Sequence, residues 1–262
     1  GVMVGYACNE TPEYLPMPVV AAQRLVTLLE ISRMTGVIPD IGPDGKVQVT
    51  MEYDDDIPVR ITTVVISVQH QPDTDLDDLF EKLKKNIFPL AFKGMPADDV
   101  EIMLNPSGKF VQGGPDADTG LTGRKLMVDS YGAFAPHGGG AFSGKDATKV
   151  DRSGAYMARF IAKNIVAAGF AQRCQVTLAY AIGEKEPVMV DVNTFGTGGP
   201  CEDDCLSAAV RKAYDLTPAG IIKQLNLLNP IYNRTAAGGH FGREDFPWEN
   251  VEHMSDLAAY IV

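Results

Sequence analysis

The sequence predicts an α+β fold of two similar domains, each a small sheet with helices on one face. A length of 262 residues is large for a single core and natural for two domains. Segments with the two-residue alternation of strands are interspersed with segments whose apolar residues recur at helical spacing. The order of these segments in the first half is loosely repeated in the second. We therefore expect domains at residues 1–112 and 113–262.

The first half begins with a predicted strand, a helix and a hairpin. The apolar run Val2–Cys8 indicates a strand. Pro18–Met34 is predicted as a helix, because proline suits a first turn and the apolar residues lie mostly on one face. The tripeptide at 43–45 predicts a turn, since its proline fixes φ and its glycine admits a positive φ. Residues 46–53 then alternate, and after an acidic turn the β-branched run Ile57–His70 completes a hairpin.

The remaining elements continue this mixture of types. A helical stripe of apolar residues from Leu76 to Ile87 and a short strand at Val100–Leu104 complete the first half. The second half is predicted to contain a helix, two paired strands, two further helices and an irregular segment, at Asp151–Ala168, Cys174–Ile182, Val188–Phe195, 203–214, 217–228 and Pro230–Trp248.

A glycine-rich passage lies between the two halves. Residues 108–144 contain 10 of the chain's 26 glycines, and only the strand-like Lys125–Tyr131 interrupts them. A loop of this length inside a compact domain is usually functional. We expect the second unit to begin within it.

Positive charge is concentrated at the end of this passage. Between Gly120 and Arg152 there are five Lys or Arg against three Asp, a local balance of +2 (5 − 3), whereas the whole chain carries −11. Glycine lets backbone N–H groups approach phosphate oxygens, and lysine and arginine supply charge for them. The sequence therefore predicts a polyphosphate site around Gly138, Gly139 and Gly140. A glycine-rich loop needed only for tight packing is the alternative.

A P-loop NTPase is a less favoured alternative. Gly139, Gly144 and Lys145 fit its spacing, but Asp146 stands where Ser or Thr would hold magnesium. The segment before the glycines, Phe134–His137, is also a poor candidate for the buried strand that a P-loop requires.

Charge and composition exclude several classes of partner and site. A net charge of −11 argues against nucleic acid or an anionic membrane as the main partner, and the apolar runs are too short to span a bilayer. The CEDDC sequence lacks the second ligand pair of a zinc site. We therefore expect four buried free thiols in a reducing cytoplasm, at Cys8, Cys174, Cys201 and Cys205.

The histidines lack neighbours at metal spacing. We expect His70, His240 and His253 to be solvated or packed residues, and His137 to shape the glycine loop.

Several motifs resemble one known family. GGGAFSGKD at 138–146, preceded by DSYG at 129–132 and followed by KVDRSGAY at 149–156, is similar to the signature of S-adenosylmethionine synthetases. Further similar motifs occur in the family's order, namely GYACNET at 5–11, NPSGKFVQGGPDADTGLTGRK at 105–125, AKNIVAAG at 162–169 and GHFGRE at 239–244. The resemblance runs from Gly1 to about Trp248 and corresponds to the central and C-terminal thirds of that enzyme. It implies two of the family's three similar domains.

The resemblance also implies a reaction. In the family, the methionine sulfur attacks the ribose C5′ of ATP, and the expelled tripolyphosphate is then hydrolysed to pyrophosphate and phosphate. The matching positions imply a catalytic set of Lys46, Arg124, Lys145 and Lys149. They imply ATP contacts by Asp44, Gly45, Lys46, Lys109, Phe110, Asp118, Arg124, Lys125, Ala141 and Lys145. Methionine contacts are implied for Asp118 and Lys149, and a Mg²⁺ ligand for Asp151.

Three of these residues have simpler alternatives on local sequence. Asp151 could serve as the N-cap of the helix that it begins. Phe110 could be a core residue rather than a partner for adenine stacking. Asp44 could belong to the turn at 43–45 without touching a ligand.

The resemblance leaves parts of the family site unmatched. The potassium ligand, a second magnesium-binding Asp, a histidine near adenosine and the methionine-gating loop are expected upstream of Gly1. We therefore expect the 262-residue chain to be an inactive fragment of a cytoplasmic enzyme that forms dimers or tetramers. The alternative function is a non-catalytic module for polyphosphate binding or dimerisation.

Overall fold

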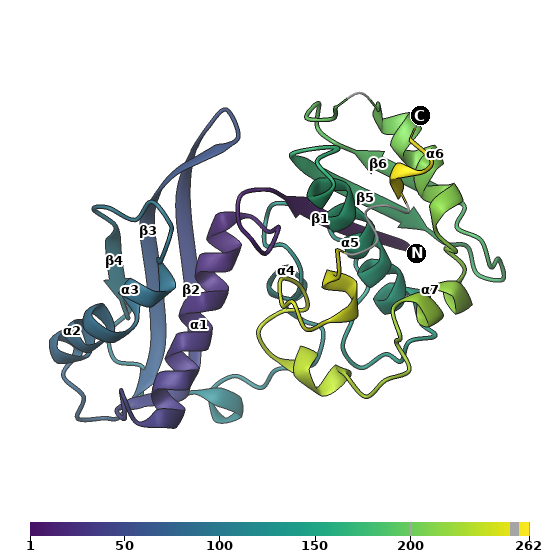
Figure 1. Ribbon diagram of the computed structural model, residues 1–262. Helices are drawn as coiled ribbons and strands as arrows, with labels where there is room; N and C mark the ends of the chain where they lie inside the picture. The colour runs from purple at the N-terminus through teal and green to yellow at the C-terminus, as the bar shows by residue number, and fades with distance from the viewer. Residues whose placement is uncertain (200, 252–256, 262) are drawn as a thin grey trace. The chain divides into compact units, whose positions relative to one another are not determined.

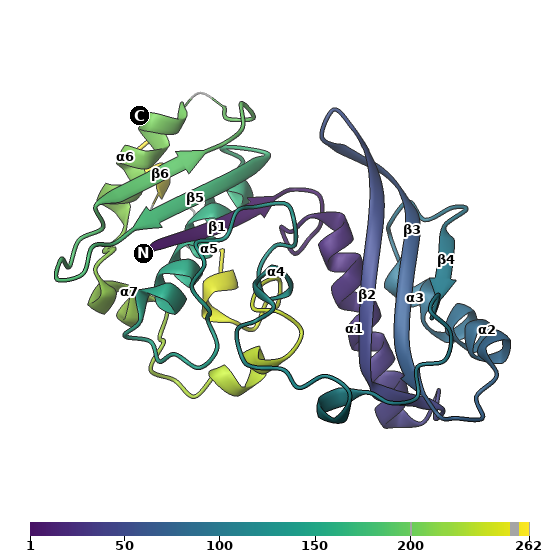
Figure 2. The same ribbon diagram turned by 180° about the vertical axis from the view of Figure 1, so that it is seen from behind.

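The computed structural model describes residues 1–199, 201–251 and 257–261 (Figures 1 and 2). The chain divides into two compact units, each with its own three-stranded sheet. Met17–Leu121 forms one, called here the α1 unit. Gly1–Pro16 and the chain from Thr122 onward form the other, called the α5 unit. Within the described residues, no helix combines the length and the apolar character needed to cross a membrane.

The α1 unit is a sheet with its helices on one face. Strands β2 (Ile41–Asp54) and β3 (Ile57–His70) form an antiparallel hairpin, and β4 (Glu101–Leu104) pairs parallel to β3. Both views in Figures 1 and 2 place the helices on the same side of this sheet. They are α1 (Met17–Thr35), α2 (Leu76–Asn86) and α3 (Phe88–Ala91). Their apolar residues meet those of β3 in one buried cluster, which confirms the predicted hairpin and helical stripes.

Local chemistry explains where these elements begin and turn. The Asp75 carboxylate accepts hydrogen bonds from the backbone N–H groups of Asp77 and Asp78 at the start of α2, as N-cap residues do. The hairpin turns at Asp55 and Asp56, whose φ angles are 44° and 66°. Aspartate tolerates this left-handed conformation better than most residues.

The predicted turn at 43–45 is wrong. These residues lie inside β2, where Ile41 faces His70 and Gly45 faces Val68. Four residue steps on β2 therefore oppose two on β3, so the extra residues form an irregular bulge. Proline cannot donate to the strand ladder, and a bulge is where a sheet tolerates it.

The α5 unit is an antiparallel sheet covered by a long helix. Strand β1 (Val2–Cys8) pairs with β5 (Arg173–Ala179), which pairs with β6 (Met189–Asn193). Helix α5 (Val150–Ala167) packs on β1 and β5. An added Cβ on Gly5 would lie 2.0 Å from the Ala158 backbone, so only glycine allows this close approach. The other helices of the unit are α4 (Leu126–Asp129), α6 (Asp203–Ala213) and α7 (Pro218–Gln224).

Two predictions about these elements are corrected. Val2–Cys8 is a strand, but it pairs with β5 rather than joining the hairpin that follows it in sequence. Lys125–Tyr131 is not a strand, because α4 and a turn occupy it. The division at residues 1–112 and 113–262 stays a prediction.

The cysteine prediction is half right. Cys8 and Cys174 are buried free thiols, and burial raises the pKa of the Cys8 thiol to about 12. Cys201 and Cys205 instead form a disulfide, with 5.7 Å between their Cα atoms. They stand four residues apart at the start of α6, where Cys201 precedes the N-cap residue Glu202 and Cys205 lies in the first helical turn.

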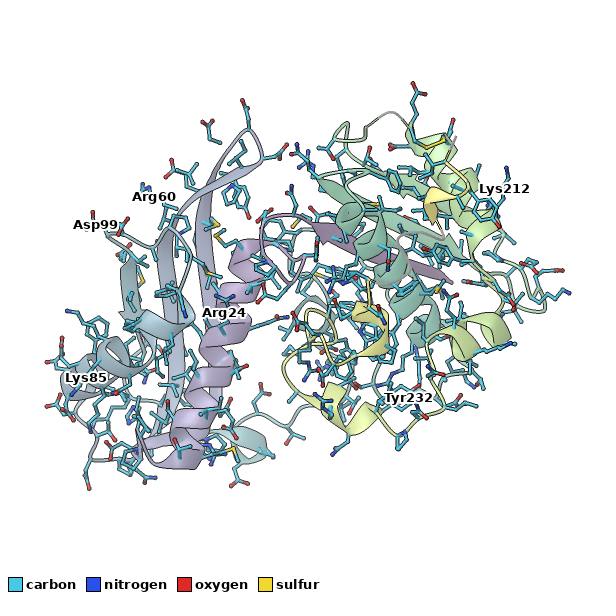
Figure 3. All side chains as sticks on the ribbon, viewed as in Figure 1. Arg24, Arg60, Lys85, Asp99, Lys212 and Tyr232 are labelled. Atoms are coloured by element: carbon cyan, nitrogen blue, oxygen red, sulfur yellow. A yellow bond between two sulfur atoms is a disulfide. The ribbon has the colours of Figure 1, made fainter. Side chains whose placement is uncertain are left out.

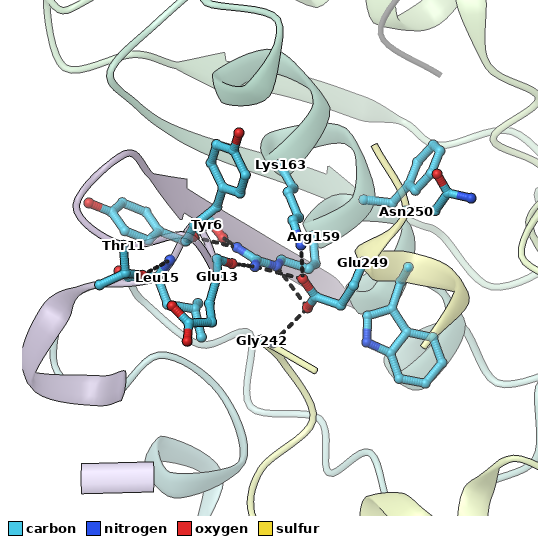
Figure 4. Close-up of polar contacts among 12 residues, drawn as sticks. Tyr6, Thr11, Glu13, Leu15, Arg159, Lys163, Gly242, Glu249 and Asn250 are labelled. Atoms are coloured by element: carbon cyan, nitrogen blue, oxygen red, sulfur yellow. Dashed lines mark hydrogen bonds and ion pairs between the residues drawn. The ribbon is translucent and has the colours of Figure 1, made fainter. Parts of the chain in front are cut away.

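A buried ion cluster connects the irregular C-terminal segment to α5 (Figure 4). This segment contains the 3₁₀ turns η2 (Tyr232–Ala236) and η3 (Pro247–Glu249). The Glu249 carboxylate accepts from Arg159 and from Lys163, each at 2.8 Å, and both its partners and Glu249 are buried. Arg159 also donates to the backbone oxygens of Tyr6 and Tyr14. One helix residue thus joins three segments of the α5 unit.

Candidate functional site

The glycine loop packs closely on the start of β1 and α5. An added Cβ on Gly138 would lie 1.7 Å from the Val2 carbonyl oxygen, and one on Gly140 would lie 2.7 Å from the Asp151 carboxylate. Gly139 has a φ of 93°. His137 Nδ1 accepts a hydrogen bond from the Gly139 N–H at 2.8 Å, so His137 shapes the loop as predicted. The packing alternative for these glycines is therefore partly correct, because each has a structural requirement within the chain.

Lys145 and Asp151 form an ion pair beside this loop. Lys145 Nζ lies 2.6 Å from Asp151 Oδ2, with 30% and 37% of the two side chains exposed. Asp151 is the second residue of α5, and the N-cap position is Lys149. The N-cap role predicted for Asp151 is therefore wrong. Its carboxylate lies in the first helical turn, where the helix dipole favours negative charge.

A second cationic segment lies along the same loop. An added Cβ on Gly123 would lie 2.4 Å from Ala141 Cβ, and one on Gly144 would lie 3.8 Å from Thr122. Residues 122–123 therefore lie beside residues 141–144, and Arg124 and Lys125 follow them directly in sequence. Within the described parts of the chain, the exposed side chains of Arg124 and Lys125 have no polar partner, so their charges are available to a ligand.

Lys149 lies at the end of the loop. Its Nζ contacts Thr148 Oγ1 at 3.1 Å and Asp146 at 3.7 Å, and more than half of its side chain is exposed. The structure thus brings five predicted residues into one stretch of the α5 unit, Arg124, Lys125, Ala141, Lys145 and Lys149, together with Asp151.

Three polar residues behind the loop, Arg152, Tyr156 and His240, were not predicted to have a role in the site. Arg152 Nη1 donates to the Lys145 carbonyl oxygen at 2.8 Å, and its Nε donates to Tyr156 Oη at 3.0 Å. Tyr156 Oη lies 2.7 Å from His240 Nδ1, and His240 Nε2 lies 3.3 Å from Ser143 Oγ. Arg152, Tyr156 and His240 are buried. The signal available in the sequence was that these three residues lie within the motifs at 149–156 and 239–244.

Aromatic rings enclose this polar group. Tyr156 stacks on Trp248 with 3.7 Å between ring centroids, and the Arg152 guanidinium lies 4.2 Å above the ring of Tyr232, labelled in Figure 3. Burial, and then the charges of Arg152 and Arg243, lower the pKa of His240 to about 3. His240 is therefore neutral at physiological pH.

The histidine prediction is confirmed in its packed form. His240 and His70 are both buried, with exposed fractions of 0% and 2%. His253 lies outside the described residues.

The remaining predicted residues belong to the α1 unit. Asp44 Oδ2 accepts from the Gly114 N–H at 2.8 Å, which holds the 105–121 passage against the bulge of β2. Phe110 is bound through its backbone, because its N–H donates to His70 Nε2 at 3.0 Å and its carbonyl accepts from the His70 N–H at 2.9 Å. The Phe110 ring is half-buried and stands outside the core cluster of this unit, so the core alternative is not supported.

Lysines of this unit lie at its surface. Lys109 Nζ donates to the Pro72 carbonyl at 3.0 Å. Lys46 is exposed on β2 opposite Ser67, beside Gly45. Asp118 is exposed, and its N–H donates to the Gly114 carbonyl at 3.0 Å.

The donor set fits a magnesium ion bound largely through phosphates. Among the described residues there is no group of three or more His, Cys, Asp or Glu side chains that could hold a metal. Asp151 is a single partly exposed carboxylate beside the cationic loop. Magnesium in proteins commonly uses one or two carboxylates together with water and substrate phosphates, and one carboxylate is what this loop offers.

The P-loop alternative lacks its required geometry. Residues 134–137 are not a strand, and α5 begins at Val150, five residues after Lys145.

Comparison with known proteins agrees with the resemblance. Residues 1–110 match the central domain of S-adenosylmethionine synthetase, and residues 112–250 match its C-terminal domain. Two relatives named S-adenosylmethionine synthase, from Lacticaseibacillus casei and Lacticaseibacillus paracasei, are each 53% identical over 267 aligned residues. These alignments cover 99% of this chain and 67% of each relative. The chain belongs to the S-adenosylmethionine synthetase family.

Proposed function

We propose that this protein takes part in S-adenosylmethionine synthesis from ATP and L-methionine, by displacement at the ribose C5′. Hydrolysis of the tripolyphosphate to pyrophosphate and phosphate is part of the proposal. The observation that carries it is the cationic loop in a chain of this family, where Lys145 is held beside Asp151 and the loop packs against residues 122–123, which precede Arg124 and Lys125. The relatives that support the proposal are covered over 67% of their length by this chain.

The cations act on the leaving group. A thioether is a neutral, modest nucleophile, so the barrier depends on stabilising the negative charge that gathers on the departing tripolyphosphate. Preorganised charges aimed at such a group are usually the largest catalytic contribution. We assign this role to Lys145, Arg124 and Lys149, with Lys125 as a further phosphate contact. We also propose Lys46 as a catalytic contact to the polyphosphate.

The ion pair gives Lys145 its orientation. Asp151 holds the Lys145 ammonium at 2.6 Å, so the side chain is ordered before a ligand binds. Asp151 is also the proposed magnesium ligand, and a bound magnesium ion would neutralise phosphate charge. No residue of this chain is assigned to potassium.

The other residues are proposed to select the substrates. Phe110 would stack on adenine, and a carboxylate such as that of Asp118 suits the methionine ammonium. Lys149 is proposed to contact methionine as well as phosphate. The backbone at Gly45 and Ala141 allows close approach of the nucleotide, with Asp44 and Lys109 as further nucleotide contacts. A cytoplasmic dimer or tetramer completes the proposal.

Product analysis tests this function. The natural-length protein is incubated with ATP, L-methionine, Mg²⁺ and K⁺, and the products are separated. We expect the sulfonium product together with pyrophosphate and phosphate. ADP as the sole nucleotide product would exclude the proposal and favour a kinase or an ATPase.

A second candidate is a non-catalytic module that binds polyphosphate or dimerises. One observation favours it for the 262-residue chain. The alignment covers 67% of the length of the relative from Lacticaseibacillus casei. Calorimetry on this chain should then detect tripolyphosphate binding that weakens as salt rises. Turnover by the chain itself, after host enzyme is excluded, would contradict this candidate.

A further inference from the structure

Three motifs of the family meet behind the cationic loop. Ser143 and Lys145 belong to the 138–146 motif, Arg152 and Tyr156 to the 149–156 motif, and His240 to the 239–244 motif. Hydrogen bonds connect all five residues, which come from segments up to 97 positions apart. Tight packing of the glycine loop does not by itself require five polar residues joined by hydrogen bonds, so the question is what these bonds do for the loop.

The hydrogen bonds have a single direction. Arg152 can only donate, so Tyr156 Oη accepts its Nε–H. The Tyr156 hydroxyl lies 2.7 Å from His240 Nδ1, and we assign it as the donor there, so that the bonds run one way from Arg152 to Ser143. With Nδ1 as the acceptor, the proton of the neutral imidazole lies on Nε2, which donates to Ser143 Oγ at 3.3 Å.

The two ends of this chain of bonds meet on the same loop. Arg152 also donates from Nη1 to the carbonyl oxygen of Lys145. The bonds thus form a ring that starts at Lys145 and closes at Ser143, with only Gly144 between them. Gly144 has a φ of 86°, a conformation that glycine adopts freely. Without an external support, this glycine would allow the backbone of Lys145 to swing.

We propose that Arg152, Tyr156, His240 and Ser143 form a positioning ring that fixes the backbone of Lys145 for its action on the leaving group. The inference rests on the proposed function of Lys145. The four ring residues are positioning residues, since their contacts are with the loop. Misplacement of a reacting or stabilising group by about 1 Å can lower rates by roughly 100-fold, so rigid support of this loop has a kinetic consequence.

The ring is tested by opening it in the middle. Tyr156→Phe removes the hydroxyl and retains the stacking on Trp248. Tyr232→Phe is the matched control, because it also removes one tyrosine hydroxyl, which donates to the Leu227 carbonyl, and keeps the ring against the Arg152 guanidinium. We expect Tyr156→Phe to lower kcat by about 10- to 100-fold with KM changed less than about threefold. Tyr232→Phe should keep wild-type kcat.

Two readouts do not depend on catalysis. Nitrogen NMR of labelled histidine should show His240 as the neutral Nε2–H tautomer in the wild type. Amide hydrogen exchange at residues 143–146 should be faster in Tyr156→Phe than in Tyr232→Phe. A wild-type protein that makes no sulfonium product would overturn the proposed function, while these two readouts would still test the ring.

A different result would overturn the positioning ring and leave the proposed function intact. If the wild type is active, and folded Tyr156→Phe matches Tyr232→Phe in kcat and in amide exchange, the positioning role is overturned and the proposed function stands. An Nδ1–H tautomer of His240 would overturn the assigned bond directions, because Nδ1 would then donate to Tyr156 Oη.

Discussion

Loss of the Glu249 charge should destabilise the α5 unit more than any surface ion pair could. Glu249 is 3% exposed and accepts four hydrogen bonds, from Arg159 at 3.1 and 2.8 Å, from Lys163 at 2.8 Å and from the Gly242 N–H at 2.8 Å. Glu249→Gln keeps the shape and leaves two buried cations without an anion. Breaking a buried pair in this way costs about 3–5 kcal/mol. For a unit of this size that corresponds to a melting temperature lower by roughly 6–20 °C.

The matched control is Glu52→Gln. Glu52 pairs with Arg60 at 2.7 Å, but about half of each side chain is exposed, so its loss should cost less than about 1 kcal/mol. Urea unfolding of the two variants and the wild type, followed by far-UV circular dichroism, which reports on both units, measures the difference. Equal stability of Glu249→Gln and Glu52→Gln would refute the reasoning.

Acid should weaken the same cluster. Burial opposes ionisation of Glu249, but Arg159 and Lys163 hold its pKa below the ordinary value. A carboxyl with a depressed folded-state pKa stabilises the protein above its unfolded pKa. This stabilisation is lost as pH falls through the folded pKa, so it should diminish only below about pH 4.5.

Two further predictions concern His240 and Gly138. The pKa of His240 is lowered to about 3 by burial and by Arg152 and Arg243, so the folded state resists a proton that the unfolded chain binds below about pH 6.5. Unfolding free energy should therefore fall by up to roughly 3 kcal/mol between pH 6.5 and 4. His240→Asn should remove most of this slope in pH-dependent urea titrations, and an unchanged slope would contradict it. Gly138→Ala should lower the melting temperature, because its Cβ would overlap the Val2 carbonyl at 1.7 Å. Gly120→Ala, with open space around it, is the control, and equal melting temperatures would disprove the close packing.

Local patterns predicted the local elements well. The alternation at residues 46–53 and the β-branched run to His70 gave the hairpin, and helical spacing gave α1, α2 and α5. The partner of β1 could not be inferred, because β5 lies more than 160 residues away and alternation does not name a partner. The tripeptide at 43–45 has the composition of a turn, but in the structure it forms a bulge within the long β2–β3 hairpin.

The sequence predicted the cations of the candidate site but not the hydrogen-bonded residues that support the loop. Lys145, Lys149 and Asp151 stand close together in sequence, so their proximity needed no tertiary information. His240 lies 97 residues from Ser143, and nothing in its immediate neighbours indicates that it meets Tyr156. Arg159 and Lys163 within the mostly apolar stretch 154–163 of α5 were a usable signal, since buried charges require partners.

The central claim is that Lys145 stabilises the leaving group, and steady-state kinetics on Lys145→Met test it most directly. Lys212→Met, at an exposed position on α6 (Figure 3), is the control with the same chemical change. Thermal melts of both variants should stay near the wild type, because a partly exposed ion pair contributes at most about 1 kcal/mol. We predict that turnover of folded Lys145→Met falls by about 100- to 1,000-fold, with a smaller change in apparent substrate binding. Lys212→Met should keep wild-type turnover. Wild-type turnover in a folded Lys145→Met protein would contradict the claim.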